Sequence, residues 1–305
     1  MGLLRLRAVR QMLLGLIPLV VIAVALLVLL VLRLVEANAP LRAATSTAQA
    51  VVVSTGLGDD GLQIAVEYTD ESGTTQTGRL TLDGARDVPL DEQIEVAYDP
   101  ERPAVVYVRG DALSNTVTDL FNGILVVALI LIAAVTVTVV RLIRRRRLTA
   151  TAGRQVQVRR TRYRRGLTDR TWFVIDTPSG PAWVPVYWDP AVERVDAEPV
   201  TVTAHGSPET DALISFDVYG VSVWPSGRRR PAAPRGTERD LTAPKGEISM
   251  ARQARADAVV VFLAPLLGIL WGYIDGSGPA GFVFATVMAV GVLFWLPSMY
   301  GSDPT

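Results

Sequence analysis

Four long hydrophobic segments restrict the fold of this sequence more than any other feature. They run from Met12 to Leu32, from Gly123 to Val140, from Ala258 to Ile274 and from Pro279 to Pro297, and none contains a charged residue. A helix rises about 1.5 Å per residue, so about 20 apolar residues cross a hydrocarbon core of about 30 Å. The sequence therefore predicts an α-helical membrane protein with four transmembrane helices.

The first segment also has features of a secretory signal. Arg5, Arg7 and Arg10 precede it, and Ala37-Asn38-Ala39 resembles a cleavage site. The hydrophobic part of a signal peptide typically has about 7–15 residues, and this segment is longer. We therefore expect an uncleaved transmembrane helix.

The last two segments are expected to form a helical hairpin. Asp275-Gly276-Ser277-Gly278-Pro279 separates them, and its glycines, proline and aspartate favour a tight turn. Gly268 and Gly272 form a G-x-x-x-G pattern, which lets two helices approach closely. We expect these glycines to pack against the fourth segment, although a partner helix would use the same face.

The charges of the two large loops predict the orientation. Residues 36–119 contain 15 acidic residues and 5 arginines, a net charge of −10. Residues 141–255 contain 12 acidic and 21 basic residues, a net charge of +9. Because basic residues are enriched in cytoplasmic loops, we expect the second loop and both termini in the cytoplasm, with the protein in a bacterial inner membrane.

Each loop has the pattern of a small antiparallel β module. In the first loop, Leu62, Ile64, Val66 and Tyr68 alternate with other residues, which is the period of a half-buried strand. About five short strands are expected there. Both loops contain a hairpin followed by a V-x-V strand, as an internal duplication would give. Any two small antiparallel modules would also share such a sequence pattern, so both interpretations stay open. A five- or six-stranded antiparallel barrel, including one of the oligonucleotide/oligosaccharide-binding (OB) shape, fits either module.

These patterns divide the chain into nine segments. They are a cytoplasmic N-terminus (1–11), transmembrane helix 1 (12–35), an extracytoplasmic β module (36–119), transmembrane helix 2 (120–143), a cytoplasmic β module with a basic start (144–226), a linker rich in proline and arginine (227–255), transmembrane helix 3 (256–275), transmembrane helix 4 (279–298) and a cytoplasmic tail (299–305).

Residues 96–103 read Val-Ala-Tyr-Asp-Pro-Glu-Arg-Pro, a Y-D-P-x-x-P motif at the end of an alternating strand. With the hydrophobic segment that follows, the motif resembles a widespread family of uncharacterised bacterial membrane proteins, frequent in actinobacteria and catalogued as a domain of unknown function. The resemblance covers residues 48–140 and implies no activity. Judged from the residues, the motif is structural. Pro100 and Pro103 end a strand, Asp99 accepts hydrogen bonds from amides two residues on, and Tyr98 packs in the core.

The sequence contains no arrangement of residues typical of a catalytic or cofactor site. It has no cysteine and one histidine, so metal sites built on cysteine and histidine clusters are excluded. We interpret that histidine, His205, as an exposed turn residue beside Gly206. The carboxylates of the first loop fall mainly in turns without calcium-loop spacing, and no glycine-rich phosphate loop occurs. We therefore predict no catalytic residue, no metal and no cofactor.

Arg144, Arg145, Arg146 and Arg147 directly follow the second hydrophobic segment. Arginines beside a membrane attract anionic lipid at about 1 kcal/mol each, so we expect these four to contact anionic lipid. They would equally serve to fix the topology. Nucleic-acid binding fits less well, because few aromatic residues lie among the arginines, and no nucleic-acid partner is predicted.

The favoured hypothesis is a non-enzymatic membrane protein that links an extracytoplasmic β module to a cytoplasmic one, as a scaffold, accessory subunit or sensor. The expected partners are membrane lipids and either another membrane or envelope protein or a second copy of the chain. The alternatives are an enzyme of envelope metabolism, which would use the outer carboxylates, and a channel or transporter subunit.

Overall fold

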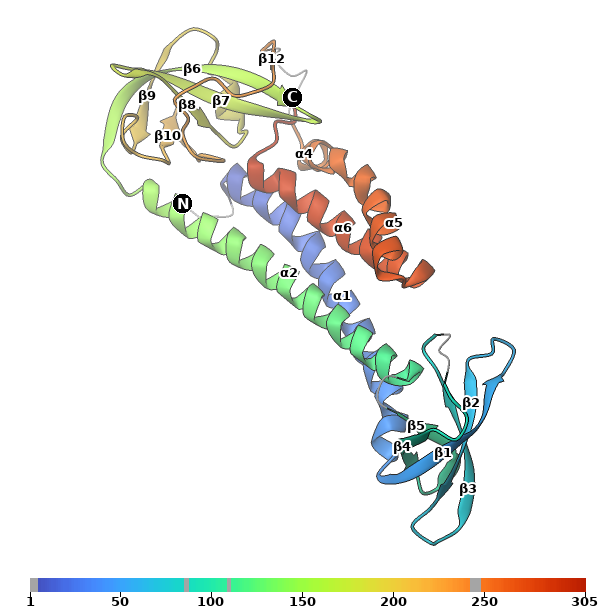
Figure 1. Cartoon of the computed structure of the whole chain (residues 1–305). Coiled ribbons are helices and arrows are strands. Elements are labelled where there is room, and N and C mark those ends of the chain that lie inside the picture. The colour runs from blue at the N-terminus through green and yellow to red at the C-terminus, as the bar shows by residue number, and fades with distance from the viewer. Residues whose placement is uncertain (1–4, 85–87, 109–110, 242–247) are drawn as a thin grey trace. The chain divides into compact units, whose positions relative to one another are not determined.

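The computed structural model describes residues 5–84, 88–108, 111–241 and 248–305 (Figure 1). Parts of the predicted N-terminal segment and linker, including Ala243-Pro244-Lys245-Gly246, lie outside the described residues. The chain divides into two compact units, one formed by Met1–Val24 with Ile130–Thr305 and the other by Ala25–Leu129. Each unit is described by itself.

Four helical segments among the described residues are long and apolar enough to cross a membrane. They are α1 (Arg7–Ala43), α2 (Ala112–Leu148), the segment Met250–Asp275 and α6 (Gly278–Tyr300). Helices α1 and α2 have 37 residues each, which at 1.5 Å per residue is about 55 Å. They extend beyond the predicted spans 12–35 and 120–143 at both ends. The first turns of α1 and the last turns of α2 can therefore contact the β module that follows α2.

The segment Met250–Asp275 consists of three successive helical pieces. These are α4 (Met250–Asp257), the 3-10 helix η2 (Ala258–Leu263) and α5 (Ala264–Asp275). Pro265 lies in the first turn of α5, where its ring and missing N–H prevent a regular α-helix from continuing through the residues before it. After α5, Gly276 adopts a left-handed conformation with φ 67°, and α6 packs back on α5 as the predicted hairpin.

The unit Ala25–Leu129 contains a closed five-stranded barrel. Its strands are β1 (Ser46–Leu57), β2 (Gln63–Thr69), β3 (Thr75–Thr81), β4 (Gln93–Asp99) and β5 (Arg102–Tyr107), in the order β1-β2-β3-β5-β4. Neighbouring strands are antiparallel, except that β3 and β5 close the barrel in parallel at Arg79 and Val105. The predicted five strands and barrel are confirmed for this module.

The Y-D-P-x-x-P motif has a structural role in this barrel. Tyr98 is buried, and its ring lies 4.8 Å from that of Tyr68. The Asp99 carboxylate accepts a hydrogen bond of 3.0 Å from the amide of Glu101, two residues on. Both features confirm the interpretation made from the sequence: the tyrosine fills the core, and the aspartate shapes the turn that ends β4.

The second β module is a seven-stranded antiparallel sheet in the unit that contains residues 130–305. Its strands are β6 (Gly153–Arg165), β7 (Thr168–Thr177), β8 (Gly180–Pro185), β9 (Val200–His205), β10 (Ser215–Val218), β11 (Val221–Val223) and β12 (Thr237–Arg239), and a short helix α3 (Pro190–Glu193) lies between β8 and β9. The strand order is β11-β10-β9-β6-β7-β8, and β12 pairs with β6. Unlike the first module, this sheet is not closed by a regular strand pair.

Residues that follow β11 cover the free edge of β8. Trp183 exchanges two backbone hydrogen bonds of 2.8 Å with Arg230, and the amide of Ser226 donates to the carbonyl of Pro185 at 2.8 Å. Both Arg230 and β12 lie in the predicted linker, which therefore contributes to the sheet. An edge strand left open would expose unpaired backbone groups, and this segment satisfies several of them.

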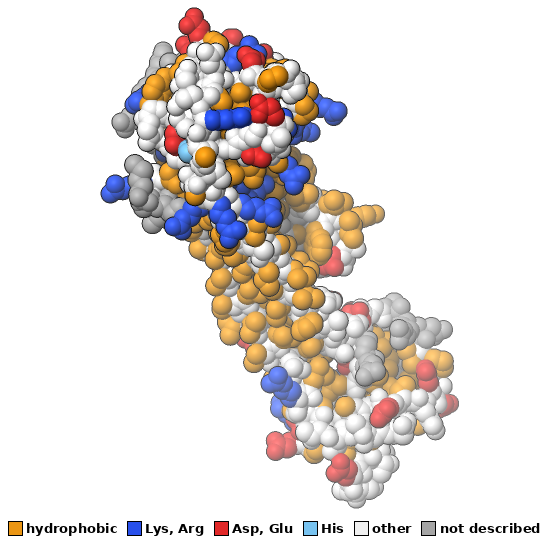
Figure 2. Space-filling view, turned by 90° about the vertical axis from the view of Figure 1, so that its left-hand side faces the viewer, with side chains coloured by type: hydrophobic (Ala, Val, Ile, Leu, Met, Phe, Trp, Pro, Cys, Tyr) orange, Lys and Arg blue, Asp and Glu red, His pale blue; other side chains and the backbone are white. Residues whose placement is uncertain are grey.

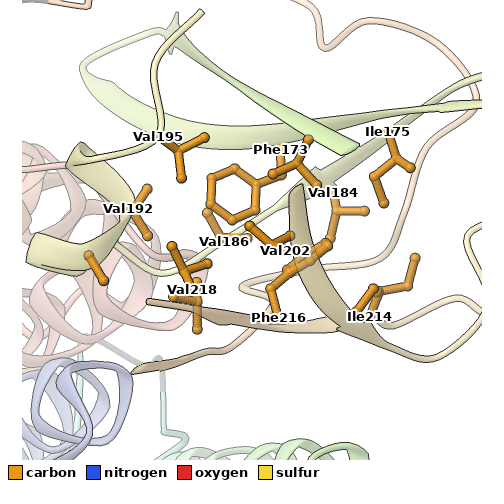
Figure 3. Close-up of a cluster of buried hydrophobic side chains, with 14 of the residues drawn as sticks. Phe173, Ile175, Val184, Val186, Val192, Val195, Val202, Ile214, Phe216 and Val218 are labelled. Atoms are coloured by element: carbon orange, nitrogen blue, oxygen red, sulfur yellow. The ribbon is translucent and has the colours of Figure 1, made fainter. Parts of the chain in front are cut away.

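Alternating residues of the second sheet form its hydrophobic core (Figure 3). Phe173, Val184, Val202 and Phe216 come from four different strands and point toward one another, and the rings of Phe173 and Phe216 are 5.1 Å apart in an edge-to-face arrangement. Val192 of α3 contacts the same cluster. The helix α3 therefore covers part of the core that the sheet alone leaves open.

The two modules share one strand order. In the first, β1 pairs with β2 and β4, β2 pairs with β3, and β4 pairs with β5. In the second, β6 pairs with β7 and β9, β7 pairs with β8, and β9 pairs with β10. The second module differs in two ways: no pair of its described strands corresponds to the closing pair β3–β5, and it adds β11, β12 and the edge segment.

Candidate functional site at the junction of the helices and the second sheet

The ends of α1, α2, α4 and α6 meet the second sheet in a region that we call the helix–sheet junction. It contains many of the unit's buried polar side chains, which are Gln11, Arg145, Arg160, Thr171, Ser226, Gln253, Asp257, Ser302 and Asp303. Figure 2 shows hydrophobic side chains covering the helices and basic side chains gathered where the helices adjoin this sheet. Burial of polar groups is unfavourable unless they are hydrogen-bonded or paired, so their arrangement here requires an explanation.

Large apolar side chains surround the polar groups of the junction. Met12 of α1 and Met299 of α6 pack against Tyr187 and Trp224 of the second module in one buried cluster. The hydroxyl of Tyr187 donates a hydrogen bond of 2.8 Å to the carbonyl of Met299. The segment Trp183–Trp188 thus provides both the edge of the sheet and its contact with the helices.

Four fully or almost fully buried residues form what we call the Asp257 cluster: Gln11 of α1, Gln253 and Asp257 of α4, and Ser302 after α6. The Ser302 hydroxyl and one Asp257 carboxylate oxygen are hydrogen-bonded. The side-chain amide of Gln11 donates to the Ser302 hydroxyl at 3.1 Å, and that of Gln253 donates to the Ser302 hydroxyl at 2.9 Å. The cluster therefore ties three separate parts of the chain together beneath the sheet.

Residues 302–305, predicted as part of a tail, are docked on the second sheet. The amide of Asp303 donates a 2.8 Å hydrogen bond to the carbonyl of Asp169, and the Asp303 carboxylate contacts the Thr171 hydroxyl. The same carboxylate lies 3.8 Å from the Arg160 guanidinium. Arg252 of α4 donates to the carbonyl of Pro304 at 3.0 Å. This segment is therefore an integral part of the junction.

The four arginines predicted to contact lipid differ in their surroundings. Arg144, Arg146 and Arg147 are exposed, whereas Arg145 is 4% exposed. The Nε of Arg145 donates to the carbonyl of Pro225, and its guanidinium carbon lies 5.8 Å from the centre of the Tyr187 ring. One residue along a helix rotates a side chain by about 100°, so Arg145 faces the sheet while its neighbours face outward.

The two glycines predicted for helix packing also differ. A Cβ atom at Gly268 would overlap the Thr286 hydroxyl and would lie 2.9 Å from the carbonyl oxygen of Phe282 on α6. A Cβ atom at Gly272 would have its nearest neighbour, the carbonyl oxygen of Gly278, at 3.4 Å. Gly268 is therefore at the close approach of α5 and α6, while Gly272 has room for a methyl group.

His205 is not the exposed turn residue expected from the sequence. It ends β9, its side chain is 12% exposed, and its ring nitrogens lie 2.9 Å from the Asp217 carboxylate and 2.8 Å from the carbonyl of Thr151. The hydrogen bond to Asp217 is the main cause that raises the pKa of His205 above its usual value. The sequence-based interpretation was wrong because the pairing of β9 with β10 places Asp217 beside the ring.

A pocket of about 310 Å³ lies in the unit that contains residues 25–129. Glu36 and Tyr107 line it together with the motif residues Asp99 and Arg102, which form an ion pair of 3.3 Å. Elsewhere in this module Asp70 accepts hydrogen bonds from Ser72, Thr74 and Gln76, which lower its pKa to about 2. A carboxyl group with so low a pKa is ionised at neutral pH, so Asp70 stabilises a turn and is unsuited to act as a general acid.

No group of three or more histidine, cysteine or carboxylate side chains that could hold a metal ion is found within the described part of the chain. Among the described residues, the polar groups available for chemistry or binding are the buried contacts of the junction, the arginine-rich surface beside it and the pocket of the first module. Comparisons with models of protein families, with curated proteins and with solved structures find no match to this chain.

Proposed function

We propose that this chain is a multi-pass protein of a bacterial inner membrane and acts as a scaffold, accessory subunit or sensor that links an extracytoplasmic β module to a cytoplasmic one. The observation that carries this proposal is the helix–sheet junction. Residues of α1, α4 and the segment after α6 share the Asp257 cluster, and the same segment contacts β6 and β7. A displacement of any of these helices would therefore change contacts with the sheet.

The surfaces of the helices support the membrane location. Ile17, Val21, Ile132 and Phe262 are each between 57% and 62% exposed, and they belong to helical segments that are apolar over most of their length. Exposed apolar patches of this extent are unfavourable in water and favourable in lipid. The exposed Arg144, Arg146 and Arg147 would then lie at the cytoplasmic surface and contact anionic lipid.

We also propose that both β modules have the OB shape and descend from one duplicated unit. The shared pairing order of β1–β5 and β6–β10 supports this. The closed five-stranded barrel of the first module is the arrangement expected of that shape. Membership of residues 48–140 in the family indicated by the Y-D-P-x-x-P motif is part of the same proposal.

Accessibility of single cysteines tests the orientation. The chain has no cysteine, and Ser72 and Ser179 are exposed in the corresponding turns β2–β3 and β7–β8. In intact cells, an impermeant thiol reagent should label Ser72→Cys and leave Ser179→Cys unlabelled until the membrane is opened. The reverse pattern would overturn the orientation, and recovery of the protein in the soluble fraction would overturn the membrane location.

Crosslinking in the native membrane, followed by purification and mass spectrometry, tests the proposed role. A stoichiometric second protein would identify an accessory subunit or scaffold. Recovery of the chain alone, with no crosslinked partner and no homo-oligomer, would contradict the scaffold role.

The outer pocket favours a second candidate function, an enzyme of envelope metabolism. Asp99, Arg102, Glu36 and Tyr107 combine two carboxylates, a cation and a phenol around one concave surface. Asp99→Ala separates the two candidates. A change in envelope phenotype at unchanged protein level would support catalysis or ligand binding in this pocket, and an unchanged phenotype would exclude a catalytic role for Asp99.

A further inference from the structure

We propose that Arg141, Arg170 and Arg230 form a binding site for the phosphate group of an acidic phospholipid. The site lies beside the helix–sheet junction, and the inference rests on the proposed membrane location.

Two aromatic rings connect the three arginines into what we call the arginine ladder. The guanidinium carbons of Arg141 and Arg170 lie 5.6 and 5.7 Å from the centre of the Tyr300 ring. Those of Arg170 and Arg230 lie 5.3 and 5.5 Å from the centre of the Trp172 ring. Cation–π contacts of this kind hold a guanidinium group in place without using its N–H groups. One nitrogen of Arg141 donates to the carbonyl of Met299 at 2.5 Å, and its other N–H groups can bind an anion.

The ladder lacks a negative partner. No Asp or Glu among the described residues forms an ion pair with Arg141, Arg170 or Arg230. Burial is the largest cause that lowers the pKa of Arg170 to about 10, and the charges of Arg230 and Arg141 lower it further. Three cations that face one another without a counter-ion are unfavourable, and a bound phosphate would remove that cost.

Two buried donors in the ladder have no partner among the described residues. They are the Nε of Arg170 and the indole Nε1 of Trp172, a side chain of a residue that is 3% exposed. Another nitrogen of Arg170 donates to the Ser226 hydroxyl at 3.0 Å, which orients the guanidinium group. Buried donors are normally hydrogen-bonded, so these two indicate an acceptor such as a phosphate oxygen.

The position along the helices favours a lipid over a free anion. Arg141 directly follows the apolar segment that ends at Val140, and Tyr300 is the last residue of α6. In the proposed orientation both lie at the cytoplasmic end of their helices, at the depth of lipid head groups, where aromatic rings and basic pockets are favoured. A phosphate anchored in the bilayer would reach this site without leaving the membrane.

The test uses the full chain, purified in a neutral detergent and examined by native mass spectrometry with added phosphatidylglycerol, phosphatidylcholine or inorganic phosphate. We expect one phosphatidylglycerol to be retained in preference to phosphatidylcholine. The triple variant Arg141→Gln/Arg170→Gln/Arg230→Gln should bind it on the order of a hundredfold more weakly, at about fivefold for each arginine. The matched control, Arg165→Gln/Arg235→Gln/Arg239→Gln, removes the same charge from exposed positions of the second module and should retain the lipid.

Equal losses in the two triple variants, or equal retention of the two lipids, would overturn the proposal. Displacement of phosphatidylglycerol by millimolar inorganic phosphate would assign the site to a free anion and overturn the lipid assignment. If the triple variant does not fold, the single variants Arg141→Gln and Arg230→Gln give the same comparison. Extraction of cell membranes with alkali tests the proposed membrane location separately from the lipid site. A protein that stays in the membrane after this treatment but does not retain the lipid contradicts only the lipid site.

Discussion

The carboxylate of Asp303 lies 3.8 Å from the guanidinium of Arg160, and both side chains are almost completely buried. The aspartate follows the last helix, and the arginine lies on the central strand of the second sheet. This pair joins the helices to the sheet at a position that water does not reach.

We expect Asp303→Ala to destabilise the protein by about 3–5 kcal/mol, because Arg160 would be left buried without its negative partner. At this size of protein the apparent melting temperature would fall by about 10 °C, measured by tryptophan fluorescence in detergent. Asp176→Ala is the matched control. It removes a pair of 3.9 Å with the adjacent Arg159, but the two side chains are 77% and 44% exposed, so about 1 kcal/mol or less is expected. Equal shifts for the two variants would show that burial of the Asp303 pair is unimportant.

The Asp257 cluster predicts that docking of residues 302–305 depends on a hydrogen-bond acceptor at position 257 more than on a negative charge there. Asp257→Leu removes the acceptor of the Ser302 hydroxyl, a loss of about 1–3 kcal/mol for a buried group. Asp257→Asn keeps a carbonyl oxygen at the same place and should be tolerated better. The rate of thiol labelling of Thr305→Cys reports whether the docked segment is released, and we expect faster labelling only with Asp257→Leu. Equally fast labelling with Asp257→Asn would mean that the charge itself is required.

Two alanine substitutions in α5 should have different effects. Gly268→Ala places a methyl group 2.9 Å from the carbonyl oxygen of Phe282, a backbone atom that cannot move aside alone. We expect a loss of about 1–3 kcal/mol, as for other overpacked sites. Gly272→Ala meets its nearest atom at 3.4 Å and should have little effect. Thermal unfolding of the two variants compares them directly, and a larger effect at Gly272 would contradict the geometry of the hairpin.

His205 should titrate above its ordinary pKa of about 6.5. A base whose pKa is raised on folding contributes stability that is complete below the unfolded value and is lost as pH rises through the folded value. The pair with Asp217 is partly exposed, so the contribution is about 1 kcal/mol or less. Since the chain has one histidine, NMR of the labelled imidazole, on protein purified without a histidine tag, gives its pKa from a single signal. Asp217→Asn should lower that pKa, while Asp176→Asn should not.

The sequence predicted most of the secondary structure, because the evidence for it is local. The four uncharged apolar segments correspond to four long helical segments, and the alternating residues around Val66 and Val96 correspond to strands of a closed barrel. Glycine and proline between residues 275 and 279 predicted the hairpin for the same reason. Pattern and turn chemistry act over a few residues, and they are visible in the chain itself.

The junction depended on contacts between residues far apart in the sequence. Gln11 meets Ser302 across 291 positions, and Thr171 meets Asp303 across 132. In the sequence, Asp257 is a single charge that directly precedes the third apolar segment. Gln253 lies four residues before it and Gln11 directly precedes the first apolar segment, and nothing in the sequence shows that the three side chains meet. Exposure of Arg144 and burial of Arg145 likewise depend on which face of α2 meets the sheet.

The sequence by itself therefore determined which segments are helices, which are strands and where the net charge changes sign. Only the tertiary structure decided which polar groups are buried together, which arginines lack a negative partner and that the segment after α6 docks on the sheet. The reason is physical. Local propensities depend on neighbouring residues, whereas the burial and pairing of a side chain depend on every element that packs around it.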